Sequence, residues 1–302
     1  MRFKKLTLFL LLLTLNLGCN GSDTKDDNGI KNSFLLLYLQ RQLTAASISS
    51  TTAANAANGT SDYDNVATYY SSMKKLELQV LYESGAEPYT GSFTNPATAT
   101  TKTVWGILED NLIEIFSNRG QSVSFTIPNS TSNMDTITSQ NKTNWTITEL
   151  LNLAKTYRKA TSSADTGRFF VAFLNGYDNE NGESNQNTIG INITGTPYLF
   201  IFKPVITAFT AGVATTATRV YVEQSTLIHE MGHALGLVNK GVSLSSSHQD
   251  TSNGKHCSNS TCVMYYANTG TSALVTFLQT YLQSESNIMF KSDSLTDIKN
   301  YK

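Results

Sequence analysis

The stretch TLIHEMGHALG, residues 226–236, places two histidines four residues apart, with a glutamate directly after the first. Apolar residues flank it, so we expect residues 220–235 to form a buried helix. On such a helix His229 and His233 lie one turn apart on the same face, with Cβ atoms roughly 5–6 Å apart. Their imidazoles can therefore converge on one metal ion. All four histidines of the chain lie between His229 and His256, which favours a site over scattered core positions.

Zinc suits such a pair of imidazoles. Neutral imidazole nitrogen binds zinc at about 2.0–2.1 Å, and a catalytic zinc keeps three protein ligands and a water molecule. Bound zinc lowers the pKa of that water to about 7. Glu230, next to the first ligand, can take the proton of this water and pass it to a leaving amine. The His-Glu-x-x-His pattern is typical of zinc peptidases, so we expect a hydrolase with Zn²⁺ as its cofactor.

The residues that follow extend this pattern. Gly236 can adopt a positive φ, end the helix and turn the chain back toward the metal. The sequence thereby resembles the metzincins, whose pattern is HExxHxxGxxH or HExxHxxGxxD, although Asn239 stands at the last position and a neutral amide is a poor zinc ligand. Residues 256–264, HCSNSTCVM, resemble the archaemetzincin continuation HCx4CxM. This resemblance implies that His256 is the third zinc ligand after an insertion; His248 and Asp250 are the alternatives.

The same resemblance implies roles for residues after the third ligand. Met264 matches the methionine of the metzincin Met-turn, below the zinc ligands. Tyr266 resembles the catalytic tyrosine of astacins and serralysins, whose hydroxyl reaches the metal or the oxyanion; Tyr265 could donate instead. The further cysteines that hold a second zinc in archaemetzincins are absent, so we expect Cys257 and Cys262 to form a disulfide in an exported protein.

The first residues predict export. A short cationic start precedes the apolar run 6–15 and then Cys19, the layout of a signal peptide over residues 1–18. The run is too short to span a membrane. A small residue before Cys19 resembles a bacterial lipoprotein signal, which implies a lipidated Cys19 and a membrane-anchored protein of the cell envelope, at the outer membrane or cell surface. Plain secretion with an incidental Cys19 is the alternative.

Composition divides the rest of the chain into two parts. Residues 19–73 include a Ser-, Thr-, Ala- and Asn-rich stretch without apolar periodicity, which indicates a tether behind the lipidated cysteine. The zinc metalloprotease domain is then expected over residues 74–302. With 22 basic and 23 acidic residues the formal net charge is −1, so no basic excess favours nucleic acid. We expect a monomer whose partner is a peptide or protein substrate.

Hydrophobic periodicity predicts the elements of this domain. We expect strands over 75–82, 121–127, 169–174, 188–193 and 198–202, and helices over 103–117, 147–159, 220–235, 273–282 and 290–301. Their order predicts an α+β fold, with a mixed twisted sheet, the active-site helix and a C-terminal helical part. The resemblance to metzincins implies a metzincin-like zinc-peptidase domain.

Together these features predict an exported zinc metalloendopeptidase with Glu230 as general base. Its substrate would lie along the edge strand 188–193 by β-augmentation. One alternative is a gluzincin-type site, for which Glu285 would be the available glutamate ligand. Another is a non-catalytic surface lipoprotein, an adhesin or binding protein, with a structural zinc enclosed by all four histidines.

Overall fold

The computed structural model describes residues 66–302, except 96, 212–214 and 270. The predicted signal peptide, Cys19 and the tether as far as residue 65 lie outside the described residues. Within the described part of the chain, no helix has both the length and the apolar character needed to cross a membrane.

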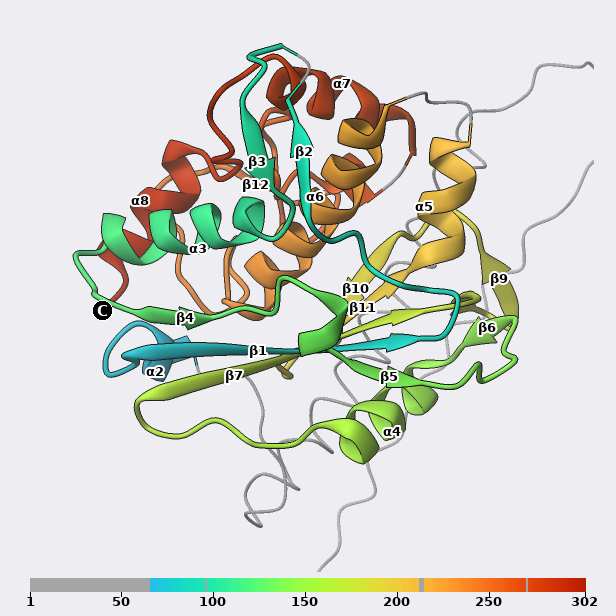
Figure 1. Ribbon diagram of the computed structural model, residues 1–302. Coiled ribbons are helices and arrows are strands. Elements are labelled where there is room, and N and C mark those ends of the chain that lie inside the picture. The colour runs from blue at the N-terminus through green and yellow to red at the C-terminus, as the bar shows by residue number, and fades with distance from the viewer. Residues whose placement is uncertain (1–65, 96, 212–214, 270) are drawn as a thin grey trace, which may run out of the picture. The chain divides into compact units, whose positions relative to one another are not determined.

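A mixed sheet forms the centre of the domain (Figure 1). Its strands are β1 (Lys75–Glu83), β4 (Ser124–Thr126), β5 (Asp135–Ile137), β7 (Thr166–Leu174), β10 (Gly190–Asn192) and β11 (Tyr198–Phe202). They follow the order β10-β11-β7-β1-β4, and β5 pairs with the other end of β1 on the side of β4. All these pairs are parallel except the pair of β10 with β11, which is antiparallel. The predicted mixed sheet is confirmed, with β10 at one edge.

The helices lie on both sides of this sheet (Figure 1). They are α2 (Val66–Tyr69), α3 (Gly106–Asn118), α4 (Ile147–Tyr157), α5 (Lys203–Thr210), α6 (Thr216–Ala234), α7 (Thr271–Leu282) and α8 (Ser292–Asn300). Helices α3, α6, α7 and α8 lie on one side and α4 on the other. Shorter elements complete the domain: β2 (Ser92–Thr94) with β3 (Thr101–Thr103), β6 (Asn144–Trp145) with β8 (Tyr177–Glu180) and β9 (Glu183–Asn185), and β12 (Gln249–Asp250) with β13 (His256–Cys257).

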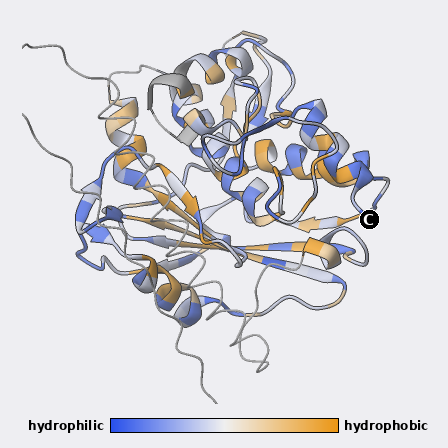
Figure 2. Cartoon of the chain, turned by 180° about the vertical axis from the view of Figure 1, so that it is seen from behind, coloured by the Kyte–Doolittle hydropathy of each residue, from blue (hydrophilic) through white to orange (hydrophobic). Residues whose placement is uncertain are grey.

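The strand sequences explain their places in the sheet. Strand β1 alternates buried and partly exposed residues, as its period-two pattern predicts. Strands β7 and β11 are buried almost throughout, because a parallel strand inside a sheet is covered on both faces. Figure 2 shows hydrophobic residues along these central strands. Periodicity did not predict α5. This helix has only eight residues, and a proline lies in its first turn.

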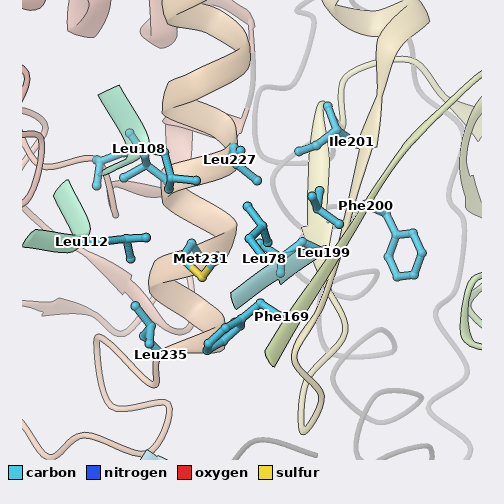
Figure 3. Close-up of a cluster of buried hydrophobic side chains, with 14 of the residues drawn as sticks. Leu78, Leu108, Leu112, Phe169, Leu199, Phe200, Ile201, Leu227, Met231 and Leu235 are labelled. Atoms are coloured by element: carbon cyan, nitrogen blue, oxygen red, sulfur yellow. The ribbon is translucent and has the colours of Figure 1, made fainter. Parts of the chain in front are cut away.

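The main hydrophobic core lies between α6 and the sheet (Figure 3). Leu227 and Met231 of α6 face Leu78 of β1 and Leu199 of β11, and α3 closes the far side of α6 with Leu108 and Leu112. All six side chains are at most 3% exposed. The sheet therefore fixes the height and rotation of α6.

The packed domain begins before residue 74, where the predicted tether ends. Tyr69, Tyr70 and Met73 are each at most 2% exposed and belong to the core. The hydroxyl of Tyr70 donates to the carbonyl of Leu235, just beyond α6, at 3.0 Å. Residues 66–73 are therefore part of the folded domain.

Truncating the core under α6 should destabilise the fold strongly. We expect Leu78→Ala to lower the free energy of unfolding by about 2–5 kcal/mol, because it leaves a cavity where a leucine met α6. Urea unfolding followed by circular dichroism measures this. Ile113→Ala on α3 is the control: Ile113 is 46% exposed, and its loss should change stability by less than about 0.5 kcal/mol. Equal effects of the two substitutions would contradict this description of the core.

Candidate metal centre

Helix α6 delivers the motif into the interior and then ends abruptly. At its start the Thr215 side chain accepts the N–H of Thr218 at 3.3 Å, which is an N-cap. At its end Gly236 has φ +83°. The N–H of Gly236 donates to the carbonyl of His233, and the N–H of Leu237 donates to the carbonyl of Gly232. These two bonds form a Schellman motif, which requires the left-handed conformation that glycine adopts readily.

Three histidines meet beside this helix end. The ring centroids of His229 and His233 are 4.8 Å apart, and those of His256 lie 5.2 and 5.0 Å from them. One nitrogen from each ring lies within 4.8 Å of the others. Within the described chain, this is the one group of three or more histidine, cysteine or acidic side chains close enough to share a metal ion.

Backbone carbonyls orient two of the three rings. The Nδ1–H of His229 donates to the carbonyl of Val263 at 2.7 Å, and the Nδ1–H of His256 donates to the carbonyl of Asn253 at 2.6 Å. Because Nδ1 carries the proton, Nε2 of both rings keeps its lone pair. The Nε2 of His229 is buried without a hydrogen-bond partner, and the Nε2 atoms of His233 and His256 are 3.3 Å apart. Buried lone pairs converging in this way fit a metal ion.

The surroundings keep these rings uncharged. Burial, together with the neighbouring His256, lowers the pKa of His229 to about 3. Burial also lowers the pKa of His233 and of His256, and Lys240 adds electrostatic repulsion to both. All three imidazoles are therefore neutral near pH 7, the form that binds metal.

The structure places the two predicted catalytic side chains differently. Glu230 follows His229 on α6 and is 3% exposed. Tyr266 is 37% exposed, and its ring packs against Tyr265 with centroids 4.8 Å apart. Glu230 is therefore inside the protein beside the first histidine, whereas Tyr266 is at the surface.

The alternative third ligands have other partners. The Nε2–H of His248 donates to Asp297 at 2.6 Å, and its Nδ1 faces the sulfur of Cys257 at 3.5 Å. The carboxylate of Asp250 accepts hydrogen bonds from the backbone of Ser252 and the side chain of Asn253. Neither residue belongs to the three-histidine group.

Asn239 also has another role. Its side chain donates to Gln249 at 3.1 Å, and its φ of +61° belongs to the turn after α6. Asparagine tolerates this left-handed conformation better than most residues. Asn239 therefore belongs to the turn and lies outside the three-histidine group.

Met264 explains the glycine inside the motif. Its side chain is fully buried, and its sulfur occupies the space into which a Cβ on Gly232 would project. A larger residue at position 232 would collide with this methionine. This contact, like the carbonyls of Val263 and Asn253, leaves no signal in a sequence motif, since it depends on where the later chain returns.

The predicted disulfide between Cys257 and Cys262 is not formed. Both are buried free thiols, and each is hydrogen-bonded to the other. The hydrogen bond between the two thiols lowers the pKa of Cys262 and raises the pKa of Cys257. Cys257 also contacts His248 and accepts the N–H of Asn259. Hydrogen bonds thus take the place of the expected covalent link.

Comparison with known proteins finds similarity to a solved structure. No protein-family model matches the chain, and no curated protein matches it. Among solved structures, the chain is similar to a zinc-dependent peptidase from Methanocorpusculum labreanum (strain Z). The two share 12% sequence identity, with 73% of this chain and 99% of that chain covered and a TM-score of 0.37.

The buried histidines should make the metal-free protein sensitive to acid. Their pKa values in the folded state lie below the ordinary value of 6.5, so the unfolded chain binds more protons as the pH falls below that value. The free energy of unfolding should then drop as the pH falls from 6.5 toward about 3, the pKa of His229. Each histidine contributes a slope of about 1.4 kcal/mol per pH unit.

Urea unfolding of chelator-treated protein across this pH range measures the slope. The His256→Gln variant is the comparison, since it lacks one of the titrating groups. In this variant the free energy of unfolding should depend less steeply on pH, by about 1.4 kcal/mol per pH unit, because one fewer proton is taken up on unfolding. Identical slopes would show that His256 is not buried in neutral form.

Proposed function

We propose that this protein is a zinc metalloendopeptidase of the metzincin type, most similar in its motif to the archaemetzincins. The observation that carries the proposal is the convergence of three neutral imidazoles, whose ligand nitrogens lie within 4.8 Å of one another, directly beside Glu230. Three histidines are a donor set that zinc favours, and three protein ligands leave one coordination position open, as in catalytic sites.

His229, His233 and His256 would hold the ion. When bound, zinc supplies a Lewis acid that polarises the scissile carbonyl and acidifies water. Glu230 takes the proton of the attacking water and delivers it to the departing amine. The carbonyls of Val263 and Asn253 hold their histidines in the required tautomer. The hydroxyl of Tyr266 or Tyr265 would stabilise the oxyanion once substrate has bound.

The peptide substrate would add to the sheet at β10. This strand is antiparallel to β11 and lies at the sheet's edge, and α6 packs against both strands. A peptide paired with this edge would use main-chain hydrogen bonds and so be held in extended form. This arrangement suits an endopeptidase, because main-chain pairing is indifferent to the ends of the peptide.

The place of action follows from the first residues. The signal peptide over residues 1–18 and the lipidated Cys19 would export the protein and anchor it in the cell envelope, with the domain acting as a monomer. A structural zinc in a non-catalytic adhesin or binding protein is less well supported, because His248 is paired with Asp297 and does not join the other histidines. Glu285, the gluzincin-type candidate, is also outside the three-histidine group.

Glu230→Gln should separate metal binding from catalysis. The amide cannot accept the proton of water, so hydrolysis should fall by about 10²–10⁴-fold while zinc content stays near one ion per chain. Cleavage of an unfolded protein substrate and elemental analysis measure the two quantities. Glu109→Gln, an exposed glutamate in the first turn of α3, is the matched control and should behave as wild type. Undiminished hydrolysis by Glu230→Gln would refute the role of Glu230 as base.

Removing the metal should abolish hydrolysis reversibly. Dialysis against a chelator should stop cleavage, and about one equivalent of zinc should restore it, because the open position exists only in the loaded centre. During dialysis against buffer without chelator, the wild type should keep its zinc and His256→Ala should lose it. Full zinc retention by His256→Ala would show that another residue is the third ligand.

A further inference from the structure

His248, the histidine outside the three-histidine group, has an unusual environment. His248 is 5% exposed, and Asp297 of α8 is fully buried. The Nε2–H of His248 donates to Oδ2 of Asp297 at 2.6 Å, while Oδ1 of Asp297 accepts the N–H of Ser245 at 2.5 Å. A buried carboxylate with both oxygens engaged and a histidine partner holds its neighbours in one geometry, since breaking either bond leaves a buried polar group unpaired.

His248 also holds the hairpin that carries His256. Strands β12 and β13 pair Gln249 with Cys257 and Asp250 with His256, and His248 directly precedes β12. Its carbonyl accepts both the N–H and the hydroxyl of Ser258, just after β13, at 2.8 and 3.0 Å. Its ring contacts the sulfur of Cys257. The backbone and the side chain of His248 therefore hold the two strands together at the open end of the hairpin.

The covalent chain alone does not fix this hairpin relative to α6. Residues 235–247, which connect them, contain no helix or strand. Asp297 offers a second connection: α8 packs against α3, and α3 packs against α6. The hairpin is thus tied through His248 and Asp297 to the same rigid frame that carries His229 and His233.

We propose that His248 and Asp297 form a positioning pair that sets the place of the third metal ligand, His256. The inference rests on the proposed function, because it gives the pair a role in the metal centre. His256 comes from a short hairpin, and a ligand from such an element holds its metal well only when the element is anchored. Neither His248 nor Asp297 would touch metal or substrate.

The test compares metal affinity in variants of the pair. We expect His248→Ala to weaken zinc binding by about 10–100-fold, the usual loss when a group that supports a ligand is removed. His248→Gln places an amide N–H where Nε2–H stood, so it should recover part of this loss. Competition with a chromophoric chelator measures affinity. The visible spectrum of the cobalt-substituted protein reports whether His256 still ligates the metal.

A matched control separates positioning from general stability. Arg119 holds the end of the same helix α8 by donating to the carbonyls of Ile298 and Tyr301, at 2.7 and 2.6 Å. Arg119→Ala should therefore lower the melting temperature while leaving zinc affinity and the cobalt spectrum near wild type. If Arg119→Ala weakened zinc binding as much as His248→Ala for a similar loss of stability, the inference would be overturned.

The remaining outcomes are also decisive. Wild-type affinity and an unchanged cobalt spectrum in His248→Ala would overturn the inference while leaving the proposed function intact. A wild-type protein that binds neither zinc nor cobalt would defeat the proposed function itself. If His248→Ala does not fold, Asp297→Asn replaces it, since it turns one acceptor of the pair into a donor. Unchanged zinc affinity in Asp297→Asn would then reject the positioning pair, and weakened affinity with Arg119→Ala unaffected would support it.

Discussion

The burial of helix α6 against the sheet is the constraint on which the candidate site depends. Almost every side chain from Val220 to Ala234 is inside the protein, so the two motif histidines face an environment with little water. There the charged form of an imidazole is unfavourable, and each ring nitrogen needs a partner. The carbonyl of Val263 satisfies one nitrogen of His229, while one nitrogen from each of the three rings lies within 4.8 Å of the others. The same packing that forms the core therefore prepares ligands for a cation.

The helix carries a second buried polar group that the fold must satisfy. Glu223, two turns before Glu230, is fully buried and pairs with Lys203 at 2.5 Å, and it accepts the N–H of Tyr89 at 2.8 Å. Burial raises the pKa of Glu223, while the ammonium of Lys203 acts in the opposite direction. Lys203 also lies over the ring of Tyr89 at 3.9 Å. This pair joins α6 to α5 and to the segment before β2, so α6 is held by polar contacts as well as by its apolar face.

Sequence patterns predicted the long elements well, because burial on one or both faces imposes a visible period. Strand β1 and helix α6 are examples, and the turn at Gly236 followed from the one residue that adopts its conformation freely. The short helix α5 and the place of residues 66–73 were missed, since both depend on packing against distant parts of the chain. The role of Val263 was invisible for another reason: a backbone carbonyl carries no residue identity. For Cys257 and Cys262 the sequence predicted a disulfide that the structure does not have. Their spacing permits a covalent bond but does not reveal the hydrogen bonds that the two thiols make.

The segment that enters the domain at Val66 has a consequence for how the protein is handled. Val66 packs against the turn after α6, where a Cβ on Gly236 or Gly241 would collide with it, and Tyr70 bonds to Leu235. These contacts brace the last turn of the helix from outside. A shortened form made for expression must therefore begin upstream of Val66. A cut at residue 74 would remove Val66 from the turn after α6 and would leave the carbonyl of Leu235 without the hydrogen bond from the Tyr70 hydroxyl.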